Sequence, residues 1–217
     1  MSNRIQKSIL LTLSATVLGL GGTYALGRSL AAPAPVQAKA AAMPAAGTYE
    51  IDKVHSAVVF RVTHLGTSWA FGRFTDFSGE VVYDDKAPEK SSVKITIQID
   101  SIDTAAGKRD DHLKSPDFFD AGQFPTASFT SKSVKKAGDK KFSVTGDLEL
   151  HGVTKPVTLD FEIVGASDGK MGTRAGFYAT FTLKRSDYGM STMPDALGDE
   201  VHVMVSLETV KGGGEKR

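Results

Sequence analysis

The sequence predicts an all-β protein, a closed antiparallel β-barrel of about eight strands with a short helical insertion. Apolar and polar residues alternate with a period of two through most of the chain after residue 47, and amphipathic helical periodicity is nearly absent. Turn residues separate the alternating runs at short intervals. The chain contains no cysteine, so an exported domain of this sequence would depend on its core and on closed backbone hydrogen bonding for stability.

The clearest alternating run covers residues 93–100, where every second residue is apolar and β-branched. Such a strand buries one face and exposes the other to water. The same pattern recurs in residues 56–62, 142–150, 157–163, 177–183 and 201–207. Segments 73–83 and 127–134 complete the set of about eight, and turns are expected at 84–88, 137–139 and 167–169.

One segment, residues 104–124, has no alternation and predicts a short helix, over residues 108–114, followed by a loop. It carries Phe118, Phe119 and Phe124, which need an apolar surface to pack against. The open end of a barrel offers such a surface, so this segment is expected to act as a lid.

The N-terminus has the features of a secretory signal peptide. Arg4 and Lys7 precede an apolar run over residues 9–20, and small residues follow up to Ala38. We therefore expect residues 1–38 to be a cleaved signal and the protein to be periplasmic or secreted. An uncleaved N-terminal anchor is the alternative.

The rest of the chain divides into a flexible linker at 39–47, a single domain at 48–210 and a disordered tail at 211–217. Removing residues 1–38 lowers the count of Lys and Arg from 26 to 23, against 25 Asp and Glu. The mature chain is then close to neutral, which argues against a nucleic-acid partner.

Residue spacing argues against a catalytic or metal centre. None of the five histidines has the spacing of a metal motif, so no metal is expected. Asp52, His55 and Ser56 supply the residue types of a hydrolytic triad, but His55 and Ser56 are neighbours on a strand and face opposite sides. We therefore expect no enzymatic activity and no cofactor.

Several polar residues have two interpretations. His64 shares the phase of Phe60 and Val62, so it is either a hydrogen-bonded interior histidine or a ligand contact. Arg109 and Arg185 lie beside acidic residues and either form ion pairs that fix loops or contact a lipid head group. The many aromatic residues of the strands leave a similar choice between a filled core and a ligand cavity.

Longer motifs resemble the YceI-like family of polyisoprenoid-binding, lipocalin-like proteins. The resemblance covers residues 48–210 and begins with Tyr49-Glu50-Ile51-Asp52 and the run from His55 to Gly66. It continues through Ser101–Thr104, Arg109–Asp120, Phe124–Phe129, Gly146–Val157, Arg185–Gly189 and Gly198–Val201.

The resemblance implies an extended lipocalin-like barrel that binds and carries or sequesters a long-chain isoprenoid lipid, a polyprenyl phosphate or a quinone type, in the periplasm. It is also compatible with a homodimer, and a carrier of this kind would contact the membrane transiently. An enzyme acting on an isoprenoid or related lipid at the barrel mouth is the alternative, and a filled barrel with a structural role is a second one.

The residues expected to bind the lipid fall into three groups: inward strand positions, the lid, and polar residues that would select the head group. They are Phe60, Val62, His64, Trp69, Phe71, Phe74, Ile95, Ile97, Ile99, Arg109, His112, Leu113, Phe118, Phe119, Phe129, His151, Phe177, Phe181 and Arg185.

Overall fold

The computed structural model describes residues 42–212. The predicted signal peptide and residues 213–217 of the predicted tail lie outside the described residues. Within the predicted linker, the carbonyl of Ala45 accepts a hydrogen bond of 2.6 Å from the Tyr49 hydroxyl. The first strand begins at Gly47 and the last ends at Lys211.

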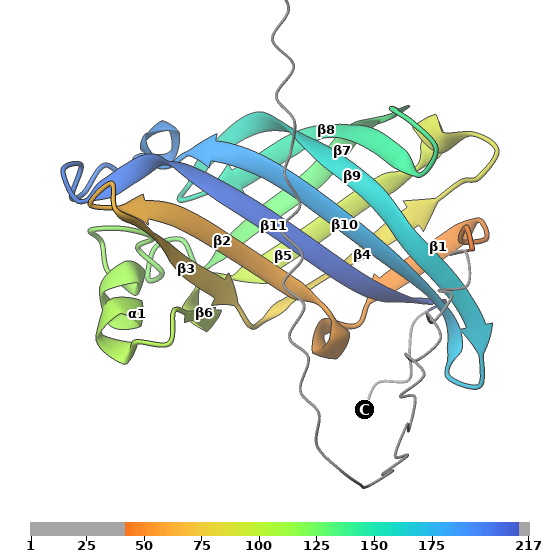
Figure 1. The fold of residues 1–217 in the computed structure, drawn as a ribbon, viewed down its shortest axis with the longest axis horizontal. Helices are drawn as coiled ribbons and strands as arrows, with labels where there is room; N and C mark the ends of the chain where they lie inside the picture. Colours follow the sequence, from red (N-terminus) through yellow and green to blue (C-terminus); the bar gives the residue numbers. More distant parts are fainter. Residues whose placement is uncertain (1–41, 213–217) are drawn as a thin grey trace, which may run out of the picture. The chain divides into compact units, whose positions relative to one another are not determined.

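Strands make up most of the described chain (Figure 1). They are β1 (Gly47–Ile51), β2 (Ala57–His64), β3 (Ser68–Phe74), β4 (Phe77–Tyr83), β5 (Ser92–Gln98), β6 (Ile102–Asp103), β7 (Thr126–Lys136), β8 (Lys141–Leu150), β9 (Val153–Gly169), β10 (Gly172–Lys184) and β11 (Leu197–Lys211). The helices are α1 (Gly107–Lys114) and four 3-10 turns, η1 (Lys53–His55), η2 (Pro88–Lys90), η3 (Ile99–Ser101) and η4 (Arg185–Tyr188). None of the helices in residues 42–212 is both long and apolar enough to cross a membrane.

The strands form one antiparallel sheet that closes on itself. Its order is β1-β4-β5-β7-β8-β9-β10-β11-β2-β3-β6. Because β1 also pairs with β11, the first eight strands of this order form a closed barrel. The closing pairs align Tyr49 with Lys211 and Ile51 with Thr209. The prediction of an all-β, eight-stranded antiparallel barrel is therefore confirmed.

Two interruptions, one between β1 and β2 and one between β3 and β4, lengthen the barrel wall at one end. β1 and β2 follow one another along the same edge of β11, separated by η1, and β3 and β4 are separated only by Thr75 and Asp76. As a result β2 and β3 extend the wall beyond the closed ring, and β3 pairs with β6 only at Arg73 and Phe74. Helix α1 lies at this end of the barrel, together with the β2–β3 hairpin (Figure 1). We call this the open end.

Most of the predicted inward residues form the core. The buried cluster contains alternate residues of β5, β8, β9, β10 and β11, including Val144, Phe161 and Phe177. At the open end, Gly72 lies against the ring of Phe60, and a side chain at Gly72 would collide with that ring. The helix predicted at 108–114 is confirmed as α1.

Three local predictions were wrong. Segment 73–83 was expected to be one strand, but β3 ends at Phe74 and β4 begins at Phe77. The alternating run was expected to continue as a strand to residue 100, but β5 ends at Gln98 and Ile99 opens η3. The turn expected at 167–169 lies within β9, because the hairpin turns at Lys170 and Met171 instead. A hydrogen bond of 2.9 Å from Thr173 Oγ1 to Asp168 Oδ1 links the two strands there.

Candidate functional site

In the described part of the chain, three cavities succeed one another along the barrel interior. The largest, about 130 Å³, lies at the open end, a second of about 60 Å³ lies in the middle, and a third of about 20 Å³ lies beyond it. The first two share the lining residues Val58, Ile97, Leu148, Phe181 and Val203. The second and third share a further pair, Val93 and Phe161. The cavities therefore form a nearly continuous apolar interior.

Twelve of the nineteen residues predicted to bind a ligand line these cavities. They are Phe60, Val62, Phe74, Ile97, Leu113, Phe118, Phe119, Phe181 and Arg185 in the largest cavity, and Ile95, Phe129 and Phe177, with Ile97 and Phe181, in the middle one. Leu113 comes from α1 and the two phenylalanines come from the segment after it, so the predicted lid does cover the open end.

Seven predicted residues do not line a cavity. Trp69 and Phe71 are exposed because Phe74 faces inward, and residues an odd number of positions away on the same strand face outward. His64 shares the inward phase but lies at the exposed end of β2. Ile99 is buried in the core cluster outside the cavities.

The other three are polar residues with local partners. Arg109 is exposed and donates hydrogen bonds to the Thr104 hydroxyl (2.8 Å) and carbonyl (2.6 Å). His112 is also exposed, with Nε2 3.0 Å from Asp117 Oδ2. His151 occupies the β8–β9 turn with a positive φ of 52°, and its Nδ1 lies 2.8 Å from a backbone carbonyl. These three residues therefore fix local structure around the open end.

Lining residues that the sequence did not single out as ligand contacts fall into two kinds. Val58, Leu148, Leu159, Phe161, Val203 and Val205 follow the period-two pattern and could have been added from it. Met190 comes from the irregular segment after η4, and Leu197 opens β11 before the alternating run begins, so neither has a periodic signal.

Arg185 is the one charged side chain among the lining residues of the three cavities. It is 7% exposed and lies on η4 at the open end. Its guanidinium donates hydrogen bonds to the backbone carbonyls of Gly198 (2.9 Å), Met190 (2.8 Å), Thr192 (2.7 Å) and Leu197 (3.1 Å). A guanidinium has five N–H donors, so within the described chain one donor on Nη2 remains for a ligand oxygen.

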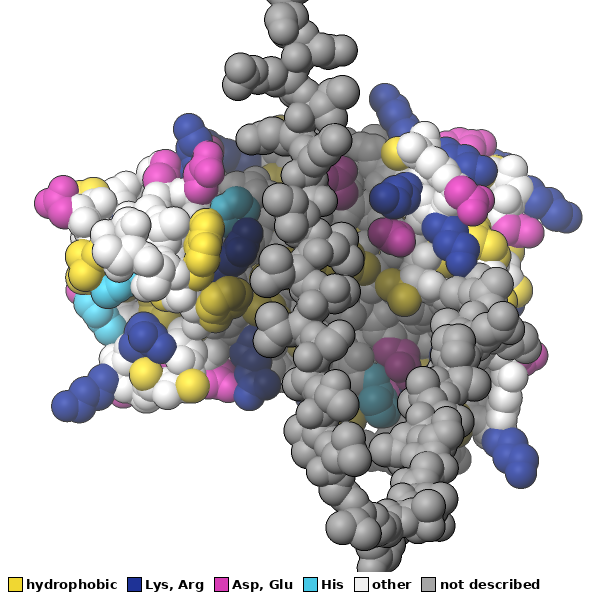
Figure 2. Space-filling model, in the orientation of Figure 1, with side chains coloured by type: hydrophobic (Ala, Val, Ile, Leu, Met, Phe, Trp, Pro, Cys, Tyr) yellow, Lys and Arg dark blue, Asp and Glu magenta, His cyan; other side chains and the backbone are white. Residues whose placement is uncertain are grey.

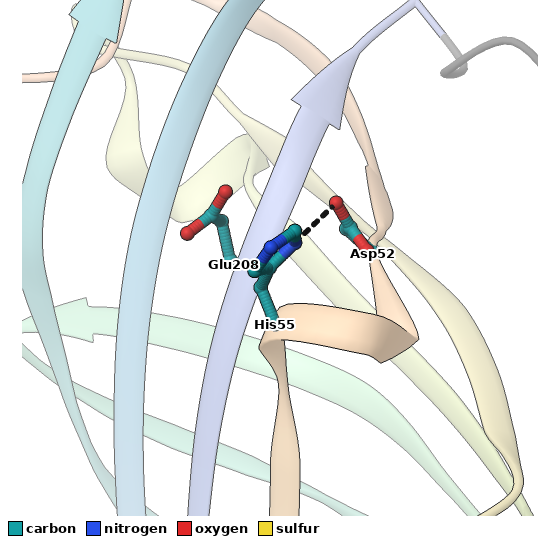
Figure 3. Close-up of side chains that lie close together, drawn as sticks. All are labelled: Asp52, His55 and Glu208. Carbon is teal, nitrogen blue, oxygen red and sulfur yellow. Dashed lines mark hydrogen bonds and ion pairs between the residues drawn. The ribbon is translucent and has the colours of Figure 1, made fainter.

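A polar cluster lies away from the cavities, beside β11. His55 Nδ1 is 2.9 Å from Asp52 Oδ2, and Glu208 approaches the same point (Figure 3). Arg174 donates to Asp52 Oδ2 (2.8 Å) and also to Glu208 Oε1, so a cation at this trio would compete with a guanidinium. Ser56 Oγ donates instead to the Asp52 carbonyl (2.7 Å). The expectation that His55 and Ser56 are neighbours on a strand was wrong, because His55 ends η1 and Ser56 precedes β2.

The cluster gives a prediction for acid stability. The hydrogen bond from Arg174, followed by the one from His55, lowers the pKa of Asp52 from 3.8 to about 2. A lowered pKa in the folded state contributes stability that is present above pH 3.8 and is lost as the pH falls towards 2. For a carboxylate whose side chain is 18% exposed we expect a contribution of about 1–2 kcal/mol.

Urea unfolding of the wild type and of Asp52→Asn between pH 6 and pH 2 measures this contribution. The variant should be less stable at pH 6, and the difference should disappear near pH 2. Asp160→Asn, at an exposed position on β9, serves as the control and should show little difference at any pH. A constant difference between wild type and Asp52→Asn across the range would contradict the assignment.

Comparison with known proteins gives consistent results. Residues 49–209 match the family model of the YceI-like domain. The chain is 44% identical over 169 residues to Protein YceI of Escherichia coli O157:H7, covering 76% of this chain and 88% of that protein. Protein YceI of Salmonella arizonae matches with the same identity and coverage.

Solved structures show the same barrel. Burkholderia cenocepacia BcnA superposes with a TM-score of 0.66 at 26% identity, covering 73% of this chain and 98% of that one. The Campylobacter jejuni YCEI protein gives 0.62 at 35% identity, covering 77% and 97%. A polyisoprenoid binding domain from Saccharophagus degradans gives 0.61 at 17% identity, covering 75% and 98%, which shows a shared fold. The family match over most of the barrel and these relatives show that the chain belongs to the YceI-like family.

Proposed function

We propose that this protein binds a long-chain isoprenoid lipid inside its barrel and carries or sequesters it in the periplasm, without converting it chemically. The observation that carries the proposal is the succession of apolar cavities that share lining residues from the open end to the far end of the barrel. An elongated hydrocarbon chain fits such an interior better than a compact ligand does.

Burial of the chain would supply the binding energy. Each buried methylene group contributes about 0.8 kcal/mol, and an isoprene unit has about five carbons. Several units can therefore offset the cost of association, about 4–15 kcal/mol, with no covalent step. The name of the Saccharophagus degradans domain, which shares the fold, supports an isoprenoid rather than another apolar chain.

The head group would lie at the open end, next to Arg185. Arg185 is the charged residue of the cavity lining and has one guanidinium donor without a partner in the described chain. A phosphate oxygen of a polyprenyl phosphate, or a carbonyl oxygen of a quinone, could accept that hydrogen bond. Phe118 and Phe119 of the lid segment would cover the tail just below it.

The periplasmic location rests on the sequence of residues 1–38, which predicts export. A neutral mature chain and a barrel without disulfides are both compatible with that compartment.

Extraction of the purified protein with organic solvent, followed by mass spectrometry, tests the proposal. We expect a prenyl lipid at close to one molecule per chain, recovered unchanged. If an added prenyl lipid is instead converted to a product, the protein is an enzyme. An extract without lipid, together with no uptake of added polyprenyl phosphate or quinone, would contradict lipid carriage.

A further inference from the structure

Four large apolar side chains are exposed at the open end of the barrel. Leu65 (59% exposed) lies in the β2–β3 turn, Trp69 (42%) and Phe71 (52%) lie on the outer face of β3, and Met193 (45%) lies in the loop between η4 and β11. We call these four residues the tip surface. Exposed apolar residues grouped in this way mark an interaction site more often than isolated ones do.

The backbone holds part of this surface in an unusual conformation. Leu65 and Met193 have positive φ angles of 52° and 55°, a region that apolar side chains rarely adopt. The two turns are joined, because the Leu65 N–H donates a 2.7 Å hydrogen bond to the Ala196 carbonyl. The fold therefore presents two apolar side chains to solvent from adjacent turns, and uncommon backbone conformations of this kind concentrate at functional sites.

A cation accompanies the aromatic residues. The guanidinium carbon of Arg61 lies 4.2 Å from the centre of the Trp69 ring, and the His202 ring packs edge-on at 5.3 Å. Within residues 42–212 Arg61 forms no ion pair with a carboxylate, whereas Arg73 on the same face is bonded to Asp103 at 2.7 Å. Figure 2 shows apolar, basic and histidine side chains on this half of the molecule, with acidic side chains among them.

This combination suits the surface of a phospholipid bilayer. Trp residues favour the interface between lipid tails and head groups, and an uncompensated Arg is attracted to anionic head groups. Leucine and methionine on turns can enter the outermost layer of tails.

The tip surface is also continuous with the lipid cavity. Phe60 and Val62 of β2 line the largest cavity, and the same strand leads directly into the turn at Leu65. On the opposite side, Leu197 lines the cavity and pairs with His64. A hydrocarbon chain that leaves a bilayer at the tip surface would thus reach the cavity without crossing the barrel wall.

We propose that the tip surface docks the open end of the barrel onto anionic phospholipid bilayers, so that a lipid passes between the membrane and the cavity. This inference rests on the proposed lipid carriage and adds the surface from which the lipid is taken up or to which it is delivered.

Trp69 is the single tryptophan of the chain and therefore reports on its own surroundings. With vesicles of phosphatidylglycerol and phosphatidylcholine, we expect its emission to shift to the blue and to be quenched by brominated lipid tails. Vesicle co-sedimentation of Leu65→Ser/Met193→Ser should be weaker by about tenfold or more. Arg61→Gln should bind weakly and lose the salt dependence of the wild type.

The matched control is Val164→Ser/Met171→Ser, which also removes two exposed apolar side chains, but from β9 and the β9–β10 turn. It should bind vesicles as the wild type does. Residues 1–38 are common to all variants and cannot cause a difference between them. Equal loss in both double variants, or no loss in either, would overturn the proposal.

Two further measurements separate the alternatives. If Leu65→Ser/Met193→Ser keeps its extracted prenyl lipid but loses vesicle binding, membrane docking is supported independently of carriage. If the wild type binds no vesicles but forms a dimer that this variant disrupts in light scattering, the tip surface binds a second copy and the docking proposal fails. Vesicle binding without any extractable or acquired prenyl lipid would overturn carriage and leave docking standing.

Discussion

Replacing Ala127 with phenylalanine should abolish lipid binding while the barrel remains folded. Ala127 is buried at the start of β7, pairs with Ile97 on β5 and lines the largest cavity. A phenyl ring at this position would occupy the space that a ligand tail needs. Because an empty cavity accommodates added bulk, the free energy of unfolding should fall by no more than about 1–3 kcal/mol, the usual cost of overpacking. We expect the extracted prenyl lipid to fall by about tenfold or more.

Val164→Phe is the matched control, since it adds bulk to an exposed position on β9 outside the barrel. This variant should retain its lipid. If Ala127→Phe also retains lipid at the level of the wild type, the ligand does not occupy the largest cavity and the proposed binding site is wrong.

Replacing Arg185 with alanine should cause the largest loss of stability at the open end. The substitution removes four hydrogen bonds to backbone carbonyls that hold the segment between η4 and β11. Hydrogen bonds from a charged donor contribute about 1.5–3 kcal/mol each, and part of this is recovered as the carbonyls become hydrated. We expect the free energy of unfolding to fall by about 3 kcal/mol or more, measured by urea denaturation with circular dichroism.

Arg109→Ala is the comparison for this variant. Arg109 is exposed and bonds only to Thr104 within the described chain, so its removal should cost less than about 1 kcal/mol. Similar losses for the two variants would mean that burial and the four carbonyl contacts do not distinguish Arg185. A variant of Arg185 that is stable but has lost its lipid would assign it to the head group alone.

The strands were predictable because the alternation of apolar and polar residues within each one shows which face is buried. β5, β8, β9, β10 and β11 alternate over most of their length, and period two needs no knowledge of the partner strand. The closure of the barrel, in contrast, could not be predicted from the pattern within a strand. The pairing of β1 with β11 joins residues about 160 positions apart in the chain, and local pattern contains no information on it.

The apolar part of the site was largely predictable and the polar part was not. Phe71 and Phe74 are three positions apart on one strand, so they could not both face inward, and the phase of β3 would have excluded Phe71. Strand phase does not show which of Arg109 and Arg185 is exposed and which is buried. Both arginines lie beside acidic residues in the sequence, and only the fold shows that one is exposed on α1 while the other is buried at the cavity.

A crystal structure of the protein purified with its native lipid tests most directly whether a lipid tail occupies the barrel interior. We expect continuous tubular electron density from Arg185 and Phe119 at the open end to Phe177 in the middle of the barrel. Side chains that meet across the barrel axis and leave no space for a hydrocarbon chain would contradict lipid binding in the barrel.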